Sequence, residues 1–328
     1  MKKIIVPIIV LCIAIMATII TIITYKKEGD LTKIRIAEVT HSVFYAPMYV
    51  AIEKGYFIDE GIDIELVLTP GADKVAIAVL SNDVEVGFAG VESAIYVYNG
   101  GEKNYIETFA GLTKRDGQFI VSRKQYNEFE LKDLIGKEVL AGRTGGMPIL
   151  NFQNALKNKG IKESDMKINT SIDFAALSGA FIGGNGDFVN LFEPLATKME
   201  KEGYGYVVAS VGQFSGEVPY TAFYARKNYI KDNKDIMISF TNAINKGLKF
   251  VNEKDEIKIA NAILKQFPDT SLNDLTTMIK RYKAADSWQS DPFINKTSFN
   301  NLLGIMKDAK LISDEVPYNK LINNLYEK

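Results

Sequence analysis

Short apolar runs alternate with segments of helical periodicity from Lys33 to about Ala225, and this alternation restricts the possible folds more than any other feature. The runs are rich in β-branched and aromatic residues, as strands are. Strands separated by helices predict an α/β fold with largely parallel sheets. The expected strands are Ile34–Val39, Ile62–Leu68, Val84–Phe88, Ile106–Leu112, Gln118–Ser122, Lys137–Ala141, Lys167–Thr170, Phe188–Leu191, Tyr206–Ala209 and Tyr220–Ala225.

Helical patterns occupy the intervals between these runs and almost the whole chain after Ala225. Apolar residues recur there at the three- and four-residue spacing of one helix face. The expected helices are Ala46–Tyr56, Ala72–Ser81, Val91–Tyr98, Leu131–Ile135, Met147–Lys159, Phe174–Ile182, Glu193–Glu202, Asp235–Asn252, Glu256–Gln266, Leu272–Lys283, Ser298–Lys307 and Tyr318–Tyr326.

Two pairs of segments indicate a duplicated unit. Glu85–Glu92 and Asp187–Glu193 both place an acid before a buried strand and a Glu at the start of the next helix. Gln118–Arg123 and Tyr220–Arg226 are similar apolar strands that end in a basic residue. Strands of this kind, about one hundred residues apart, fit two crossovers between lobes, since a chain of this length prefers more than one unit. The expected division is 31–119 with 219–328 as a discontinuous first lobe, and 120–218 as the second.

The N-terminus contains Ile4–Thr24, which is 21 residues without a charge. Such a segment is long enough to span a hydrocarbon core of about 30 Å. We expect residues 1–30 to form an uncleaved transmembrane anchor or a signal segment. A lipidated Cys12 is an alternative, although Leu11 precedes it where a small residue is usual, and cleavage is a third.

Charge and composition exclude several functions. One Cys and one His leave no ligands for a Cys/His zinc site and no disulfide framework. Four of the 39 basic residues precede Glu28, so the rest of the chain carries 35 basic against 40 acidic residues, a net charge of −5. An acidic body argues against nucleic-acid binding. The scarcity of Cys and His favours binding over catalysis, because most nucleophilic mechanisms need such a pair.

The candidate ligand-binding residues lie where strands are expected to end and helices to begin. Ligands of open α/β sheets sit at these ends, where helix N-termini present free N–H groups. Aromatic side chains there can stack on a ligand, glycines allow close approach, and an Arg can bind an anion. Ordinary packing, helix capping or solvated ion pairs are the alternative explanation for each. The candidates are His41, Phe44, Tyr45, Gly90, Glu92, Ser93, Arg115, Thr144, Gly145, Phe192 and Glu193.

Several of these segments together resemble a known family. The stretch APMYVAIEKGYFIDEGIDIEL, then GADKVAIAVLSNDVEVGFAGVESAIY, and later DLIGKEVLAGRTGGMPILNFQNAL resemble the solute-binding proteins of ABC transporters for nitrate, sulfonate, taurine and thiamine-pyrimidine precursors. The resemblance runs from about Lys33 to Tyr326. It implies a two-lobed, type II periplasmic-binding-protein-like fold with a ligand cleft between the lobes.

The resemblance also implies a function. We expect a non-catalytic, monomeric binding protein, outside the cytoplasm and attached to the membrane, that uses no cofactor or metal and delivers a solute to ABC permease subunits. The aromatic loops and the residues around Tyr45 and Glu92 favour a thiamine-pyrimidine precursor over sulfonate, taurine, nitrate or a riboflavin-like solute. A pyrimidine-biosynthesis enzyme is an alternative that the lack of a Cys cluster disfavours. A receptor sensory domain is another.

Overall fold

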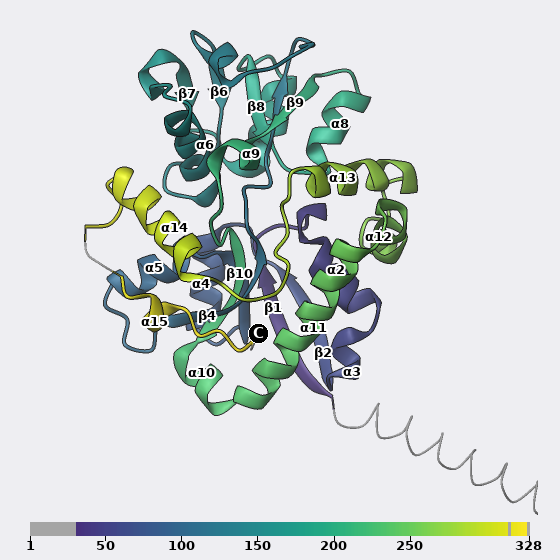
Figure 1. The fold of residues 1–328 in the computed structure, drawn as a ribbon, viewed down its shortest axis with the longest axis vertical. Coiled ribbons are helices and arrows are strands. Elements are labelled where there is room, and N and C mark those ends of the chain that lie inside the picture. The colour runs from purple at the N-terminus through teal and green to yellow at the C-terminus, as the bar shows by residue number, and fades with distance from the viewer. Residues whose placement is uncertain (1–30, 314–315, 327–328) are drawn as a thin grey trace, which may run out of the picture.

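The computed structural model describes residues 31–313 and 316–326, which form two five-stranded sheets (Figure 1). The first sheet, with the order β2-β1-β3-β10-β4, and its helices are called lobe 1. The second, with the order β7-β6-β8-β5-β9, is called lobe 2. The strands are β1 (Thr32–Glu38), β2 (Ile62–Leu68), β3 (Val86–Gly90), β4 (Ile106–Thr113), β5 (Phe119–Ser122), β6 (Glu138–Leu140), β7 (Lys167–Asn169), β8 (Phe188–Leu191), β9 (Tyr206–Ser210) and β10 (Thr221–Arg226).

The two sheets share one topology, which confirms the predicted duplication. β3 and β8 hold the same place in their sheets, and so do β10 and β5. Pairing is parallel among β1, β2 and β3 and among β6, β7 and β8. The expectation of largely parallel sheets is confirmed, since four of the five strands of each sheet run in one direction. The exceptions are β5 and β10, which enter directly from the other lobe and pair antiparallel on both sides. The exact lobe boundaries at 119/120 and 218/219 stay a prediction.

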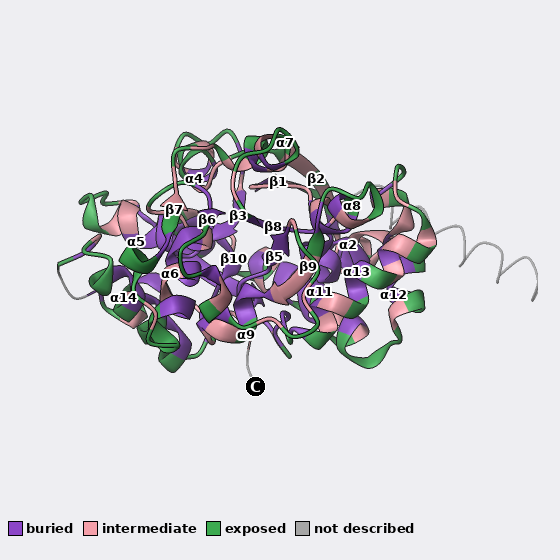
Figure 2. Ribbon diagram, turned by 90° about the horizontal axis from the view of Figure 1, so that it is seen from above, coloured by how far each residue is buried: buried purple, intermediate pink, exposed green. Residues whose placement is uncertain are grey.

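Helices cover both faces of each sheet, and buried side chains fill the space between (Figure 2). In lobe 1, one face of the sheet packs on α2 (Ala46–Glu53) and α11 (Lys234–Glu253). The other face packs on α4 (Ala72–Leu80) and α5 (Glu92–Asn99). The helices of the first half of the chain are α2 (Ala46–Glu53), α3 (Tyr56–Asp59), α4 (Ala72–Leu80), α5 (Glu92–Asn99), α6 (Met147–Asn158), α7 (Leu177–Ile182), α8 (Leu195–Lys201) and α9 (Val211–Ser215), with the 3₁₀ turns η1 (Val43–Tyr45), η2 (Leu131–Leu134), η3 (Glu163–Asp165) and η4 (Phe174–Ala176).

The C-terminal third returns to lobe 1 and is helical. Its longest helix lies along α2 and has one apolar face, as its sequence period requires. Three of its helices begin at Asp255, Ser271 and Asn295, whose side chains accept a hydrogen bond from the first turn. The elements are α10 (Lys227–Asp232), α11 (Lys234–Glu253), α12 (Glu256–Ile263), η5 (Leu264–Gln266), α13 (Leu272–Ala284), α14 (Lys296–Asp308) and α15 (Tyr318–Leu321).

Two helix predictions need correction, and two helices were not predicted. The helix from Ala46 to Tyr56 breaks at Gly55, which has a φ of 71°, and a short helix follows. The helix expected over Tyr318–Tyr326 ends at Leu321, because the chain then turns alongside β4 and Asn323 donates its N–H to the Thr108 carbonyl. The sequence reading also missed α9 and α10, which are short.

The predicted anchor within residues 1–30 lies outside the described residues. Among the residues that the structure does describe, none of the helices combines the length and the apolar character needed to cross a bilayer.

Candidate functional site

The carboxyl ends of β1 and β3 in lobe 1 face those of β6 and β8 in lobe 2, and the two connections between the lobes, 114–118 and 216–220, pass between them (Figure 1). We call this region the interlobe seam. The lobes touch here directly. Ser42 Oγ donates to the Glu193 carbonyl at 2.6 Å, and Tyr96 Oη donates to the Gly145 carbonyl at 2.9 Å. The seam is where both lobes can contact one solute, as binding between lobes requires.

Phe44 lies at the centre of an aromatic cluster in the seam. Its ring centroid is 5.5 Å from those of Tyr45 and Phe192, and 5.7 Å from that of Tyr220. These spacings are typical of favourable tilted and edge contacts. A Cβ on Gly117 would lie 2.6 Å from the Phe44 ring, so a larger residue would displace it. The predicted residues Phe44, Tyr45 and Phe192 are thus brought together from both lobes.

Glu92 begins α5 at the lobe 1 side of the seam and is buried. Its carboxyl group curls over Gly90, where a Cβ would lie 1.9 Å from Glu92 Oε2 and 2.6 Å from the side chain of Met147 in lobe 2. Oε2 has no hydrogen-bond partner among the described residues. Burial raises the pKa of Glu92 to about 7, although backbone hydrogen bonds from Glu92, Met147 and Ser93 oppose the shift.

Asp116 is a second buried carboxyl group, on the connection between β4 and β5. Oδ1 accepts the N–H of Gln118 at 2.6 Å, while Oδ2 has no hydrogen-bond partner among the described residues. Burial raises the pKa of Asp116 to about 8. The Tyr220 hydroxyl faces this carboxyl group closely enough to perturb it, but without hydrogen-bond geometry, and it too is unpaired within the described chain.

Other buried amide side chains in lobe 2 have at least one polar atom without a partner among the described residues. Neither polar atom of the Asn190 side chain in β8 has a hydrogen bond within the described residues, nor do Gln118 Oε1 and Asn151 Oδ1. Buried polar atoms in native proteins are almost always paired with protein or water. Unpaired atoms at the start of β5, near the end of β8 and in the second turn of α6 therefore indicate a polar ligand or ordered water.

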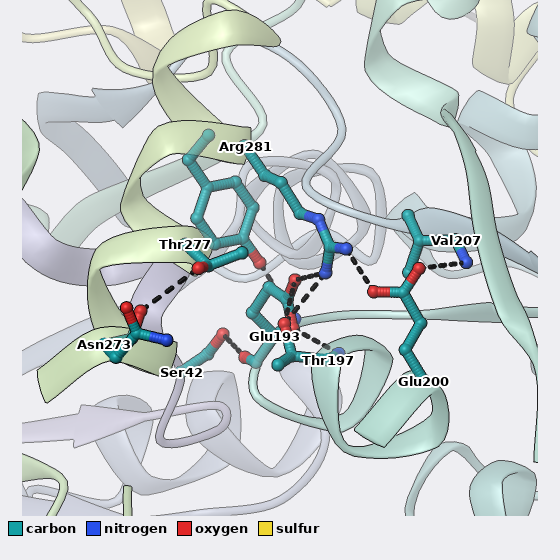
Figure 3. Close-up of polar contacts among 9 residues, drawn as sticks. Ser42, Glu193, Thr197, Glu200, Val207, Asn273, Thr277 and Arg281 are labelled. Carbon is teal, nitrogen blue, oxygen red and sulfur yellow. Dashed lines mark hydrogen bonds and ion pairs between the residues drawn. The ribbon is translucent and has the colours of Figure 1, made fainter. Parts of the chain in front are cut away.

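Glu193 follows β8, and its carboxylate is fully engaged (Figure 3). It accepts the backbone N–H and the hydroxyl of Thr197 at 2.7 and 2.9 Å, and Arg281 Nη1 from α13 at 2.8 Å. Figure 3 shows the Arg281 guanidinium between Glu193 and Glu200, to which its Nη2 also donates. The carboxylate that the sequence offered for ligand binding is thus held by a helix packed against lobe 1.

The remaining predicted residues have partners of their own or lie outward. His41 contacts Glu38 Oε1 at 2.8 Å and the Gln266 carbonyl at 2.9 Å. Burial opposes the charged form of His41, but these two contacts outweigh it and raise its pKa. Ser93 Oγ donates to the Gly90 carbonyl at 2.6 Å.

Of three further predicted residues, Arg115 and Thr144 are directed outward and Gly145 lies at the edge of the seam. Arg115 pairs with Glu217 at 3.0 Å and with Asp286 at 3.4 Å, on the outside of the seam. Thr144 is exposed, while Gly145 contributes its carbonyl to Tyr96 and has a φ of 88°, which favours glycine. An Arg directed into the seam, as an anion site would need, is therefore not found at position 115.

Asp116, Gln118, Asn190 and Tyr220 were not among the predicted site residues. A signal existed for Asn190, which is the one polar residue in the apolar run Phe188–Phe192. Asp116 and Gln118 are close to Arg115 in the sequence. Arg115 was predicted in their place because its positive charge could bind an anion. No group of three or more acids, Cys or His that could hold a metal occurs in the described ranges.

Residues 43–256 match the sequence model of the family described as NMT1/THI5 like. A Bacillus subtilis (strain 168) protein, YtlA, whose name describes it as a binding protein, is 40% identical over 313 residues, which cover 95% of this chain and 94% of that protein.

Solved structures share the fold. The ligand-binding component of an ABC-type import system from Staphylococcus aureus, solved with zinc bound, superimposes with a TM-score of 0.71 at 17% identity, covering 90% of this chain and 98% of that one. The alkanesulfonate-binding protein SsuA from Xanthomonas axonopodis pv. citri, bound to MOPS, gives a TM-score of 0.70 at 13% identity, covering 90% and 99%.

Proposed function

The chain belongs to the NMT1/THI5-like family of ABC-transporter substrate-binding proteins, and on this premise we propose that it captures a thiamine-pyrimidine precursor at the interlobe seam and delivers it to a permease. The observation that carries the proposal is the set of buried, unpaired polar atoms at the seam, with Glu92 from lobe 1 and Asn190 from lobe 2 among them. Unpaired buried atoms cost free energy that a bound polar solute recovers.

Aromatic rings from both lobes support a flat solute. Phe44 and Tyr45 lie on the turn after β1, while Phe192 follows β8. Binding would close the lobes, because contacts that exist only in the closed form shift the population towards it. A ring inserted between these side chains would supply such contacts from both sides.

We also propose that the body works outside the cytoplasm as a monomer that catalyses no reaction, as expected of a transport component. Attachment to the membrane through Ile4–Thr24 belongs to the same proposal. Membrane fractionation of the full chain, compared with a chain starting at Lys33, tests the attachment. Recovery of the full chain in the soluble fraction would contradict it.

A thermal-shift screen tests the solute. A ligand at one hundred times its Kd stabilises the protein by about 2.7 kcal/mol. We expect 4-amino-5-hydroxymethyl-2-methylpyrimidine to raise the unfolding temperature, and riboflavin, taurine, methanesulfonate and nitrate to have no effect. A shift with taurine or riboflavin alone would replace the pyrimidine by that solute.

Variants place the binding site. Tyr45→Phe removes only the hydroxyl group that interacts with the Thr221 side chain, and we expect it to weaken binding while the ligand-free unfolding temperature changes little. Tyr204→Phe, on an exposed loop of lobe 2, is the matched control. Equal affinity in Tyr45→Phe and Tyr204→Phe would remove the Tyr45 hydroxyl from the site.

A further inference from the structure

Two buried carboxyl groups lie in the seam without full partners. Glu92 is 3% exposed and Asp116 is 0% exposed, and one oxygen of each, Oε2 and Oδ2, has no hydrogen bond among the described residues. They come from separate segments, the first turn of α5 and the connection between the lobes. A structural carboxylate at such depth normally carries hydrogen bonds to both oxygens or an ion pair, because its desolvation is costly.

Tyr220 links the two carboxyl groups. Its hydroxyl is buried and unpaired within the described chain, and it interacts electrostatically with both Asp116 and Glu92. Its ring lies 5.7 Å from that of Phe44 and 6.4 Å from that of Phe192, between the aromatic residues of the two lobes. The unpaired hydroxyl and the two unpaired carboxyl oxygens therefore share one region beside the aromatic cluster.

Among the described residues, no basic side chain acts on these two acids, and Arg281 at the seam is held by Glu193 and Glu200. Within the described residues, the basic groups on the connections that meet there are already paired with other acids, mostly towards solvent. The pairs are His41 with Glu38, Lys114 with Asp286, Arg115 with Glu217 and Asp286, and Arg143 with Asp73 and Asp173.

We infer that the solute carries a positive charge, as an ammonium or a protonated amino-heterocycle, and that Glu92 and Asp116 bind this charge. The inference rests on the proposed function and narrows its solute by charge. A cation next to buried carboxylates replaces the solvation that they lose, whereas an anion would meet a like charge in a poorly screened environment. Sulfonates and nitrate are thereby excluded.

The pH dependence of binding has a definite sign. Burial raises the pKa of Glu92 to about 7 and that of Asp116 to about 8, so both become largely neutral at pH 6. A cation that needs the ionised forms must then bind more weakly at pH 6 than at pH 8. The titratable groups that face the two acids are tyrosines whose pKa burial raises far above this range, namely Tyr45, Tyr96, Tyr220 and Tyr224.

Matched compounds of different charge test the inference by calorimetry on the purified protein. One series is 4-amino-2-methylpyrimidine with an aminomethyl, hydroxymethyl or carboxylate group at C5. The other is benzylamine, benzyl alcohol and benzoate, which carry the same charges on a different ring. We expect the ammonium member of a series to bind at least about tenfold tighter than its carboxylate member at pH 8. The ammonium member should also bind about tenfold more weakly at pH 6.

Variants assign the charge to its carboxyl groups. Glu92→Gln and Asp116→Asn should each weaken the ammonium compound about tenfold and the alcohol about twofold or less. Glu102→Gln, an exposed acid in the loop after α5, is the matched control and should leave both affinities unchanged. The ligand-free unfolding temperature of each variant shows whether it is folded. If a variant fails to fold, the pH dependence of ammonium binding by the wild-type protein still tests whether ionised carboxyl groups bind the solute.

The outcomes separate this inference from the proposed function. Tight binding of a carboxylate, taurine or nitrate without ammonium binding would overturn the inference and leave a solute-binding protein. Binding of benzylamine without binding of any pyrimidine would support a positively charged solute and contradict the proposal that the solute is a pyrimidine. The inference of a positively charged solute would also be overturned if the ammonium compounds bound equally at pH 6 and pH 8, or if both variants bound them as the wild-type protein does. Failure of every compound would overturn both.

Discussion

Glu92 in lobe 1 and Glu193 in lobe 2 occupy equivalent positions of a duplicated topology and have opposite environments. Each follows the strand in the middle of its sheet, β3 or β8, and each is buried. Glu193 accepts two hydrogen bonds from Thr197 and one from Arg281. Glu92 Oε2 accepts none from the described residues.

The difference shows how one layout yields two roles. Helix α13 reaches across to lobe 2 and supplies Arg281 to Glu193, and Lys201 of α8 pairs with Asp274 of α13 beside it. No basic side chain among the described residues pairs with Glu92, which receives only backbone hydrogen bonds, from its own residue, Ser93 and Met147 of lobe 2, and packs against Gly90. Glu193 therefore joins the lobes. Glu92 Oε2 has no hydrogen bond among the described residues and is free to accept one from a solute.

The largest effect is expected from Glu193→Ala. Removing one partner of a buried ion pair leaves the other charge uncompensated and costs about 3 to 5 kcal/mol. Arg281 Nη1 and both Thr197 donors would lose this buried acceptor, while Arg281 Nη2 keeps its pair with Glu200, so we expect the lower end of this range, a loss of about 3 kcal/mol in the free energy of unfolding in urea.

The matched control is Lys201→Gln, which breaks an exposed ion pair between the same two helices. It should cost about 1 kcal/mol or less, because solvent screens such pairs. Equal losses in Glu193→Ala and Lys201→Gln would mean that the buried network does not hold the lobes together.

Glu92→Gln is expected to have a smaller effect of opposite sign, an increase in the free energy of unfolding at pH 8. The pKa of Glu92 is raised from 4.5 to about 7, so the folded state binds the proton more tightly than the unfolded chain does. The ligand-free protein must therefore lose stability as the pH rises from about 4.5 to about 7. Glu92→Gln should remove about 3 kcal/mol of that loss and be the more stable protein at pH 8.

Urea unfolding at pH 4, 6 and 8 measures this effect on wild-type protein, Glu92→Gln and the exposed control Glu102→Gln. Asp116, with its pKa raised to about 8, adds a loss of the same sign that persists in Glu92→Gln. Parallel stability curves for the wild-type protein and Glu92→Gln would show that Glu92 titrates normally. The contrast with Glu193 would then disappear.

The smallest effects come from the single hydrogen bonds that cross the seam next to each glutamate. Ser42→Ala removes the bond to the Glu193 carbonyl, and Tyr96→Phe removes the bond to the Gly145 carbonyl. A typical loss is about 1 kcal/mol, with more for a fully buried pair. Thermal unfolding should show the larger loss for Ser42→Ala, because Ser42 is buried and Tyr96 is only partly so. A larger loss for Tyr96→Phe would mean that the hydrogen bond beside Glu92 contributes more to the contact between the lobes than the one beside Glu193.

Periodicity identified every strand of the described chain. The central strands, such as β3 and β8, are buried along their whole length and read as apolar runs, while the edge strand β2 shows the alternation of a half-exposed strand. Periodicity could not reveal that β5 and β10 run antiparallel to both neighbours, since direction depends on how the chain crosses between the lobes. The end of α15 at Leu321 also depends on a distant contact, the bridge from Ile322 to Thr108.

The sequence named loops that the structure brings together at the seam, but it did not name all of the buried polar residues there, and ligand binding at the seam stays a prediction. Loops at strand ends could be named from the sequence, and Phe44, Tyr45, Glu92 and Phe192 do meet there. Arg115 was chosen for its charge, yet its partner Asp286 lies 171 residues away and holds it outside the seam. Asp116, its neighbour, has the buried and unpaired oxygen instead.

Four properties follow from the amino-acid sequence alone: the alternation of strands and helices, the duplication, the family resemblance and the near absence of Cys and His. These properties depend on residues close together in the chain or on composition. Which of the two similar glutamates is paired with a positive charge depends on the folded chain, because the basic side chain comes from a remote helix. Arg281 is 88 residues from Glu193, and no local pattern encodes that meeting.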